Sequence, residues 1–457
     1  MCARWSRPVV PLAALLFALL VSSATATATA TAVRRRELRK TQAARTPNAT
    51  LVLLPNNTLG AKCLDGSPPG YYFRPGTGAG RLSWHIFLPG GAWCVTPADC
   101  AARAKTRLGS TKGFPSNPAH YGAQLRPAFD GILSPDASLN PSLYSWNLVR
   151  LIYCDGGGYA GTRGRFNLTS AAGPGNSSNA TGSSQISKST NSSVAPTAPI
   201  YLDGWNIMRA IMQDLQQNRG IRSASQILLS GSSAGGQATV NLCDWLAASF
   251  PAASTRCLVD SGFFFDTRDR AMNYTFRALA QNLTALHRPA NPNCSYAARP
   301  SHQWKCFFPQ YTLHNASTPV FLFHTPFDYV AAMIGNQLPN NYTYTNDCLR
   351  EILDSQKNLS GVVRSKGWSS LQWKPSSACS LSERDTLFST AFGLYDQVRV
   401  LSQERTSFGA YIPMSSVHSG ITNAYWNKPW VNRASISNAF TVWSSVAFKN
   451  VSIILSQ

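Results

Sequence analysis

The chain has 457 residues, of which 44% are hydrophobic and 13% charged, which excludes a disordered protein, a coiled coil and a small disulfide knot. A chain of this length can bury a full hydrophobic core without metals or crosslinks. The first 45 residues hold eight of the 41 basic residues and one of the 20 acidic ones, so the remainder keeps a formal charge of +14. This balance favours an anionic partner, such as an acidic polysaccharide, an anionic lipid or a nucleic acid.

The first 26 residues have the order of a secretory signal peptide. Arg4 and Arg7 precede an apolar run from Val9 to Val21, and Ala24-Thr25-Ala26 fits a cleavage site. The run is shorter than the roughly 20 residues that span a bilayer, so we expect a secreted protein, extracellular or in a cell wall, without stable membrane insertion. The alternative is a Golgi-type signal-anchor.

Downstream of the signal, residues 27–58 are expected to form a flexible Thr/Ala-rich and basic tail, with ordered chain beginning near Leu51. Residues 59–457 are expected to form one domain. Within it, residues 164–199 are rich in Ser, Asn, Thr and Gly and are predicted to be a glycosylated surface loop.

Apolar strands alternate with helices along the domain, which predicts a mostly parallel sheet covered on both faces. The predicted strands, in chain order, are Leu82–Leu88, Asn147–Tyr153, Gln226–Leu229, Thr318–His324 and Ala410–Ile412. The predicted helices are Asp203–Gln217, Ala238–Phe250 and Arg384–Ser402.

Glycosylation acceptors and cysteines agree with secretion. Thirteen Asn-x-Ser/Thr sequences occur, at Asn48, Asn56, Asn167, Asn176, Asn179, Asn191, Asn273, Asn282, Asn293, Asn315, Asn341, Asn358 and Asn450. Ten cysteines remain after Cys2 of the signal, and their spacing does not match a zinc site, so no metal is expected. Five disulfides are predicted: Cys94–Cys100, Cys243–Cys257, Cys294–Cys306, Cys348–Cys379 and, by what is then left, Cys63–Cys154.

Ser233 is the candidate nucleophile. Gly231-Ser232-Ser233-Ala234-Gly235 matches G-x-S-x-G, with a predicted strand before it and a helix after it. This is the setting of a nucleophile elbow, where serine sits on a tight turn that tolerates little side-chain bulk. The start of the helix adds a partial positive charge where an oxyanion would form.

A serine nucleophile needs a base, and the base needs an orienting acid, in the chain order Ser, Asp/Glu, His. Among the histidines after Ser233, His418 follows the last predicted strand and is the candidate base. Asp328 stands four residues beyond a buried strand, at its carboxyl end, and is favoured as the acid. Asp260 and Asp266 remain alternatives.

The oxyanion hole is assigned to backbone N–H groups. The glycine turn around Gly91 and Ala92 follows a predicted strand and is similar to the loop that serves this role in lipases and esterases. Ala234, directly after the nucleophile, would supply a further N–H group.

Several blocks together resemble the pectin acetylesterase family, which also contains the Notum deacylases. The blocks, in chain order, are Cys63–Pro68, Leu88–Cys94, Tyr153–Gly156, Gly231–Gly236, Asp260–Phe264 and Cys306–Gln310. The resemblance implies a secreted serine carboxylesterase with an α/β-hydrolase core. Its nucleophile would be Ser233, its acid Asp328, its base His418, and its oxyanion donors Gly91, Ala92 and Ala234. It also implies the Cys63–Cys154 bridge.

The chain departs from the plant members of this family near the site. Plant members usually have Cys at the position of Ser232 and Gly at that of Ala92, and they have cysteines around the catalytic histidine, where Ser416 and Ser419 stand here. Plant members also have a Cys-rich C-terminal tail, whereas no cysteine follows Cys379 here. The loss of both groups of cysteines together suggests a lost crosslink, which would leave the loop around His418 less constrained.

The expected function is hydrolysis of O-acetyl esters on an acidic, pectin-like polysaccharide, with no cofactor and no nucleic-acid partner. One alternative is a Notum-like deacylase, for which Trp93 and Phe263–Phe265 could line an acyl pocket. The other is a secreted glycan-binding relative without activity. Nothing in the sequence specifies an oligomeric state.

Overall fold

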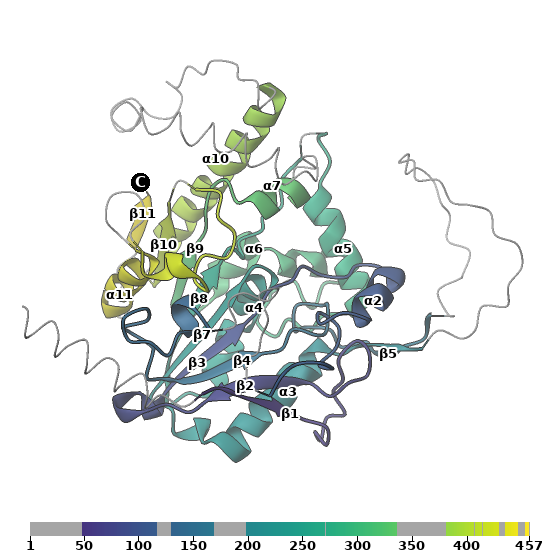
Figure 1. The fold of residues 1–457 in the computed structure, drawn as a ribbon. Helices are drawn as coiled ribbons and strands as arrows, with labels where there is room; N and C mark the ends of the chain where they lie inside the picture. Colours follow the sequence, from purple (N-terminus) through teal and green to yellow (C-terminus); the bar gives the residue numbers. More distant parts are fainter. Residues whose placement is uncertain are drawn as a thin grey trace, which may run out of the picture.

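The computed structural model describes residues 48–116, 129–168, 198–269, 271–335, 381–405, 407–413, 415–428, 435–446 and 453–456. In this part of the chain nine strands form one twisted sheet through the middle of the molecule, in the spatial order β1-β2-β4-β3-β7-β8-β9-β10-β11 (Figure 1). The strands are β1 Thr50–Leu53, β2 Gly70–Arg74, β3 Ser83–Leu88, β4 Asn147–Leu151, β7 Gln226–Ser232, β8 Ser254–Asp260, β9 Val320–Phe323, β10 Phe408–Ile412 and β11 Ile453–Ser456.

Seven neighbouring strands, from β4 to β11 in the spatial order, run parallel. Only the β1–β2 and β2–β4 pairs in this sheet are antiparallel. The carboxyl ends of β7, β8, β9 and β10 therefore meet at one edge, which is where sites of open α/β sheets form. This is the predicted α/β-hydrolase-like arrangement.

Helices cover the sheet on both faces, as parallel strands require (Figure 1). The described helices are α2 Pro97–Ala104, α3 Gly204–Asp214, α4 Ala234–Ser249, α5 Thr275–His287, α6 Pro309–Thr312, α7 Tyr329–Gly335, α10 Leu381–Glu404 and α11 Ile436–Val446. None of these described helices is both long enough and apolar enough to cross a membrane.

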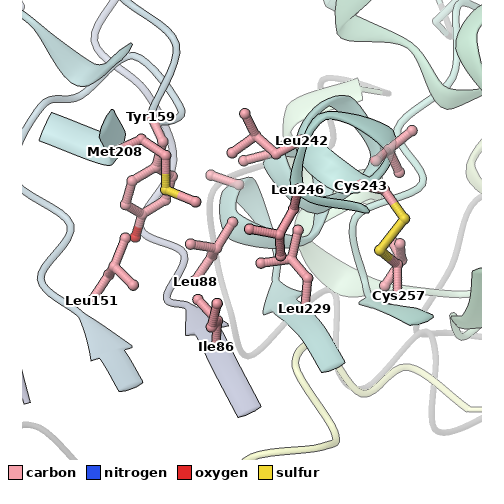
Figure 2. Packing of buried hydrophobic residues seen from close by; sticks show 14 of the residues in the cluster. Ile86, Leu88, Leu151, Tyr159, Met208, Leu229, Leu242, Cys243, Leu246 and Cys257 are labelled. Carbon is pink, nitrogen blue, oxygen red and sulfur yellow. A yellow bond between two sulfur atoms is a disulfide. The ribbon is translucent and has the colours of Figure 1, made fainter. Parts of the chain in front are cut away.

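Each strand contributes to two cores, because successive side chains point to opposite faces of the sheet. Ile86 and Leu88 of β3 pack with Leu229 of β7 beneath α3 and α4 (Figure 2). Phe87 lies on the other face, in a cluster with Trp443 of α11. Both clusters consist of closely packed apolar side chains, so the edge where the strands end is held on a rigid support.

The predicted strands and helices are present, with two boundaries moved. β1 begins at Thr50, which agrees with order beginning near Leu51 and places the domain start before residue 59, inside the range assigned to the tail. The segment Gly164–Phe166 is strand β5, paired with β6 (Ile200–Leu202), and not loop as predicted, because Phe166 packs against a small core. Residues 169–197 of the predicted loop, the signal peptide and most of the tail lie outside the described residues.

Four disulfides have the predicted pairing: Cys63–Cys154, Cys94–Cys100, Cys243–Cys257 and Cys294–Cys306. The predicted Cys348–Cys379 bridge lies outside the described residues. Cys63–Cys154 joins residues 91 positions apart, whereas Cys243–Cys257 joins residues 14 apart. Since crosslinks restrict the unfolded chain more when they close longer loops, the first bridge should contribute more stability.

Replacing both Cys63 and Cys154 by serine is expected to lower the free energy of unfolding by about 4.5 kcal/mol, against about 3 kcal/mol for the matched Cys243/Cys257 pair. Guanidinium denaturation of the two variants measures this difference. A smaller loss for the Cys63/Cys154 pair would contradict the loop-length argument.

Candidate active site

Ser233 lies on a strained turn between β7 and α4. Its backbone has φ 58° and ψ −125°, a region that non-glycine residues rarely adopt. The turn is also tightly packed, since a Cβ at Gly235 would lie 1.9 Å from the carbonyl oxygen of Leu88. The glycines of G-x-S-x-G are therefore needed because larger side chains would clash in this turn. Ser233 lies between the end of β7 and the start of α4, which is the position of the nucleophile in a nucleophile elbow.

His418 and Asp328 are brought together from two neighbouring strand ends. Asp328 follows β9 and His418 follows β10, and the His418 Nδ1 lies 2.7 Å from Asp328 Oδ2 and 2.9 Å from Oδ1. Asp328 Oδ1 also accepts hydrogen bonds from the N–H groups of Val330 and Ala331, at the start of α7. The carboxylate is therefore held in one orientation, and it fixes the imidazole with Nε2 as its remaining nitrogen.

The electrostatics of this pair suit an orienting acid and a base. Burial lowers the pKa of His418, but the charge and hydrogen bond of Asp328 and the charge of Asp260 outweigh it, so the pKa is raised from 6.5. Burial raises the pKa of Asp328, but the charge and hydrogen bond of His418 prevail and lower it from 3.8. Asp328 is consequently ionised wherever His418 is neutral.

None of the other histidines after Ser233 has a hydrogen bond to Asp328, and all of them are described. His287 bonds the carbonyl of Cys94, His302 bonds Ser301, and His314 bonds Glu404. His324 is buried at the end of β9, where desolvation lowers its pKa to about 4.

The alternative acids have other partners. Asp266 forms a two-pronged ion pair with Arg277, at 2.8 and 3.0 Å, and accepts a hydrogen bond from Tyr311. Asp260 lies at the end of β8 and contacts the loop after His418 rather than its imidazole.

The predicted oxyanion turn lies directly against Ser233. A Cβ at Gly90 would approach the Cβ of Ser233 to 2.6 Å and the amide nitrogen of Ala234 to 3.3 Å, so only glycine fits. Within the described part of the chain, the N–H groups of Gly91, Ala92 and Ala234 have no hydrogen-bond acceptor. Three unused donors beside a candidate nucleophile are what an oxyanion hole requires.

Two side chains that were not predicted as site residues donate hydrogen bonds to the carbonyl groups of this turn. Arg103 donates from Nη2 to the carbonyl of Gly91 at 2.7 Å, and the hydroxyl of Tyr153 donates to the carbonyl of Ala92 at 2.7 Å. The guanidinium also lies 5.1 Å from the ring centre of Tyr153. Tyr153 stands in one of the family blocks, but Arg103 lies in α2 without any sequence signal.

Replacing Tyr153 by phenylalanine is expected to lower kcat/KM about 5- to 20-fold with KM nearly unchanged, because the Ala92 carbonyl loses a buried donor worth about 1–2 kcal/mol. Steady-state hydrolysis of p-nitrophenyl acetate measures this change. Tyr72→Phe is the matched control, since the Tyr72 hydroxyl bonds the Pro115 carbonyl from β2. Equal kcat/KM values in the two variants would rule out a role for Tyr153 in the turn.

Residues 42–171 and 181–454 match the family model described as pectinacetylesterase. The chain belongs to this family. Pectin acetylesterase 5 of Arabidopsis thaliana is 35% identical over 274 residues, which cover 59% of this chain and 55% of the relative. The palmitoleoyl-protein carboxylesterase NOTUM of Schmidtea mediterranea and that of Homo sapiens are each 26% identical, over 60% of this chain and 47% and 50% of the relatives.

The chain thus spans about half the length of the curated relatives it matches. Ser232 and Ser419, two of the serines that stand where the resemblance led us to expect cysteine, both take part in hydrogen bonds. Ser232 donates to Asp260 Oδ2 at 2.6 Å, and the N–H of Ser419 donates to the hydroxyl of Ser261 at 3.0 Å. The Ser419 hydrogen bond ties the loop after His418 to the residue that follows β8. The expectation that this loop is less constrained than a crosslinked one stays a prediction.

One group of potential metal ligands occurs among the residues that the structure describes. It consists of Cys94, Cys100 and His287, whose ligand atoms lie within 4.8 Å of one another. The two sulfurs are joined in a disulfide and offer no thiolate, so this group does not have the donors of a zinc site.

Proposed function

We propose that the protein is a secreted serine carboxylesterase that hydrolyses O-acetyl esters on an acidic, pectin-like polysaccharide. The observation that carries the proposal is the His418–Asp328 pair, which lies at the same edge of the sheet as the strained Ser233 elbow. Family membership and the printed activities of the relatives support the reaction class.

The reaction would proceed by two acyl transfers. His418 Nε2 takes the proton of the Ser233 hydroxyl as its oxygen attacks the ester carbonyl, and Asp328 stabilises the imidazolium that forms. The N–H groups of Gly91, Ala92 and Ala234 would donate hydrogen bonds to the carbonyl oxygen, on which negative charge develops. Loss of the sugar alcohol, protonated by His418, leaves an acyl-enzyme that water then hydrolyses.

Packing of the aromatic residues favours a short acyl group. Trp93 lies with its ring centre 5.2 Å from that of Phe264 and 4.9 Å from that of Phe307. Phe263 and Phe264 are at most 2% exposed. These rings fill the space behind the oxyanion turn with one another, so residues that could have lined a long acyl pocket serve as core. The formal charge of +14 that remains after the first 45 residues supports an anionic glycan as the carrier of the ester.

Acyl-length preference and Ser233 dependence test the proposal together. Purified protein is assayed on p-nitrophenyl esters from acetate to palmitate and on acetylated polygalacturonate, with Ser233→Ala in parallel. We expect the highest kcat/KM on acetate, and acetate release from the polymer. A preference for long acyl chains would instead support a deacylase like the NOTUM relatives, and no hydrolysis by folded protein would support a glycan-binding protein.

Secretion rests on the predicted signal and on the acceptor asparagines. Every acceptor in the described chain is exposed: Asn48, Asn56, Asn167, Asn273, Asn282, Asn293 and Asn315. Expression of the full chain in a eukaryotic host should yield protein in the medium whose mass falls on enzymatic removal of N-glycans. Retention of all the protein in the membrane fraction would favour the signal-anchor instead.

A further inference from the structure

We propose that Asp260 is a positioning residue that locks the loop of the catalytic base to the nucleophile elbow. The inference builds on the proposed esterase, and it assigns a role to a carboxylate that the reaction itself does not use. Asp260 is fully buried at the end of β8, between the Ser233 turn on β7 and the His418 loop.

The two carboxylate oxygens of Asp260 bridge the two catalytic segments. From the elbow, the Ser232 hydroxyl donates to Oδ2 at 2.6 Å. From the other side, the N–H groups of Gly420 and Ile421 donate to Oδ1 and Oδ2 at 3.0 and 3.2 Å. The main chain adds a third link, since the Asp260 carbonyl accepts from the N–H of Ser233 at 2.8 Å.

Ser261 forms a second connection between Asp260 and the loop of His418. Its hydroxyl donates to Asp260 Oδ1 at 3.1 Å and accepts from the N–H of Ser419 at 3.0 Å. Ser233, Ser261 and Ser419 all have positive φ, at 58°, 49° and 65°. Three strained residues around one buried carboxylate indicate that the network holds a geometry that these residues would not adopt alone.

The role suits a carboxylate in particular. Four groups donate hydrogen bonds to the Asp260 carboxylate. Two of them are backbone N–H groups, which can only donate hydrogen bonds and cannot accept them. An amide has a single acceptor oxygen and two donors of its own, so asparagine cannot satisfy the same four groups. Burial raises the pKa of Asp260 from 3.8, although the hydrogen bonds that it accepts act in the opposite direction. When ionised, Asp260 adds negative charge near His418, whose imidazole also interacts with Asp328 and His324.

The test compares Asp260→Asn with Asp244→Asn in the full-length protein. Asp244 of α4 is a matched control, because its carboxylate also accepts hydrogen bonds from two backbone N–H groups, those of Ser317 and Thr318. These residues precede β9 and are not part of the candidate site. We expect Asp260→Asn to lower kcat on p-nitrophenyl acetate 10- to 100-fold with KM nearly unchanged, and to move the acid limb of kcat to lower pH. Asp244→Asn should leave the kcat and the limb unchanged.

A second readout does not depend on activity. The pKa of His418 is followed by NMR of protein with ¹³C-labelled histidine, assigned with His418→Asn, and it should fall in Asp260→Asn. If the wild type proves inactive but this pKa falls, the esterase proposal fails and the positioning role stands. A folded Asp260→Asn protein whose kcat, pH limb and His418 pKa match the wild type would overturn the proposal. Should Asp260→Asn not fold, Ser261→Ala is measured in the same way, and an unchanged kcat there would overturn it too.

Discussion

Replacing Ser233 by alanine is expected to lower kcat/KM on p-nitrophenyl acetate by about four orders of magnitude or more. The substitution removes the oxygen that attacks the ester, while the oxyanion turn and the His418–Asp328 pair stay in place. Residual catalysis of about 10³–10⁴ over water can persist from such remaining groups, so the rate should fall far without reaching the uncatalysed value. Steady-state kinetics on purified protein measure the loss.

Folding has to be preserved for this result to bear on chemistry. Alanine keeps the Cβ and the backbone of the elbow, so the variant should unfold at nearly the same temperature as the wild type. Ser225→Ala is a suitable control, since Ser225 precedes β7 on the surface and bonds only the Leu82 carbonyl through its hydroxyl. Ser233→Ala activity equal to that of this control would reject Ser233 as the nucleophile.

Much of the fold could be predicted because its strands and helices carry strong local patterns. The run Ser83–Leu88 is mostly apolar and became a fully buried strand. The spacing of apolar residues from Trp205 to Leu215 became helix α3, which ends in a single π-turn before Gly220. Gly220 has φ 82°, the left-handed conformation that stops helices.

Other elements lack such patterns. β2 begins at Gly70 and contains Arg74, whose guanidinium is buried and donates to the Leu133 carbonyl. The amphipathic helix α5 ends at His287, whose ring packs against Cys94 and Cys100. In both cases tertiary contacts decide the structure, and one sequence does not reveal contacts between residues far apart in the chain.

Some residues of the candidate site have a local sequence signal, whereas others are recognised only from their contacts in the folded protein. Ser233 could be predicted because the elbow needs a local sequence, and Asp328 because it follows a buried strand. The function of Asp260 could not, since its ligands lie at Ser232, Gly420 and Ile421 and meet only in the folded sheet. Arg103 is likewise recognisable only once α2 is seen behind the oxyanion turn.

Replacing Asp328 by asparagine is expected to lower kcat by about 10³- to 10⁴-fold and to shift the pH dependence of what remains. The amide cannot stabilise the imidazolium and can turn its NH₂ towards His418 Nδ1, which favours the wrong tautomer. In the wild type, activity should rise as pH increases through a His418 pKa above 6.5, because only the neutral imidazole accepts the Ser233 proton. In Asp328→Asn this limb should move to lower pH, since the charge that raised the pKa is gone.

The free energy of unfolding should depend on pH in a direction that the His418–Asp328 pair determines. The folded-state pKa of His418 is raised from 6.5, so its contribution is complete below that pH and is lost as pH rises through the folded value. The folded-state pKa of Asp328 is lowered from 3.8, so its contribution is present above that pH and is lost as pH falls through the folded value. Denaturation of wild type and Asp328→Asn should therefore differ most between about pH 4 and 6.5, and less above the folded-state pKa of His418. A difference that grows towards alkaline pH would mean that the two side chains are not paired in the folded protein, and Asp328 would then no longer qualify as the orienting acid.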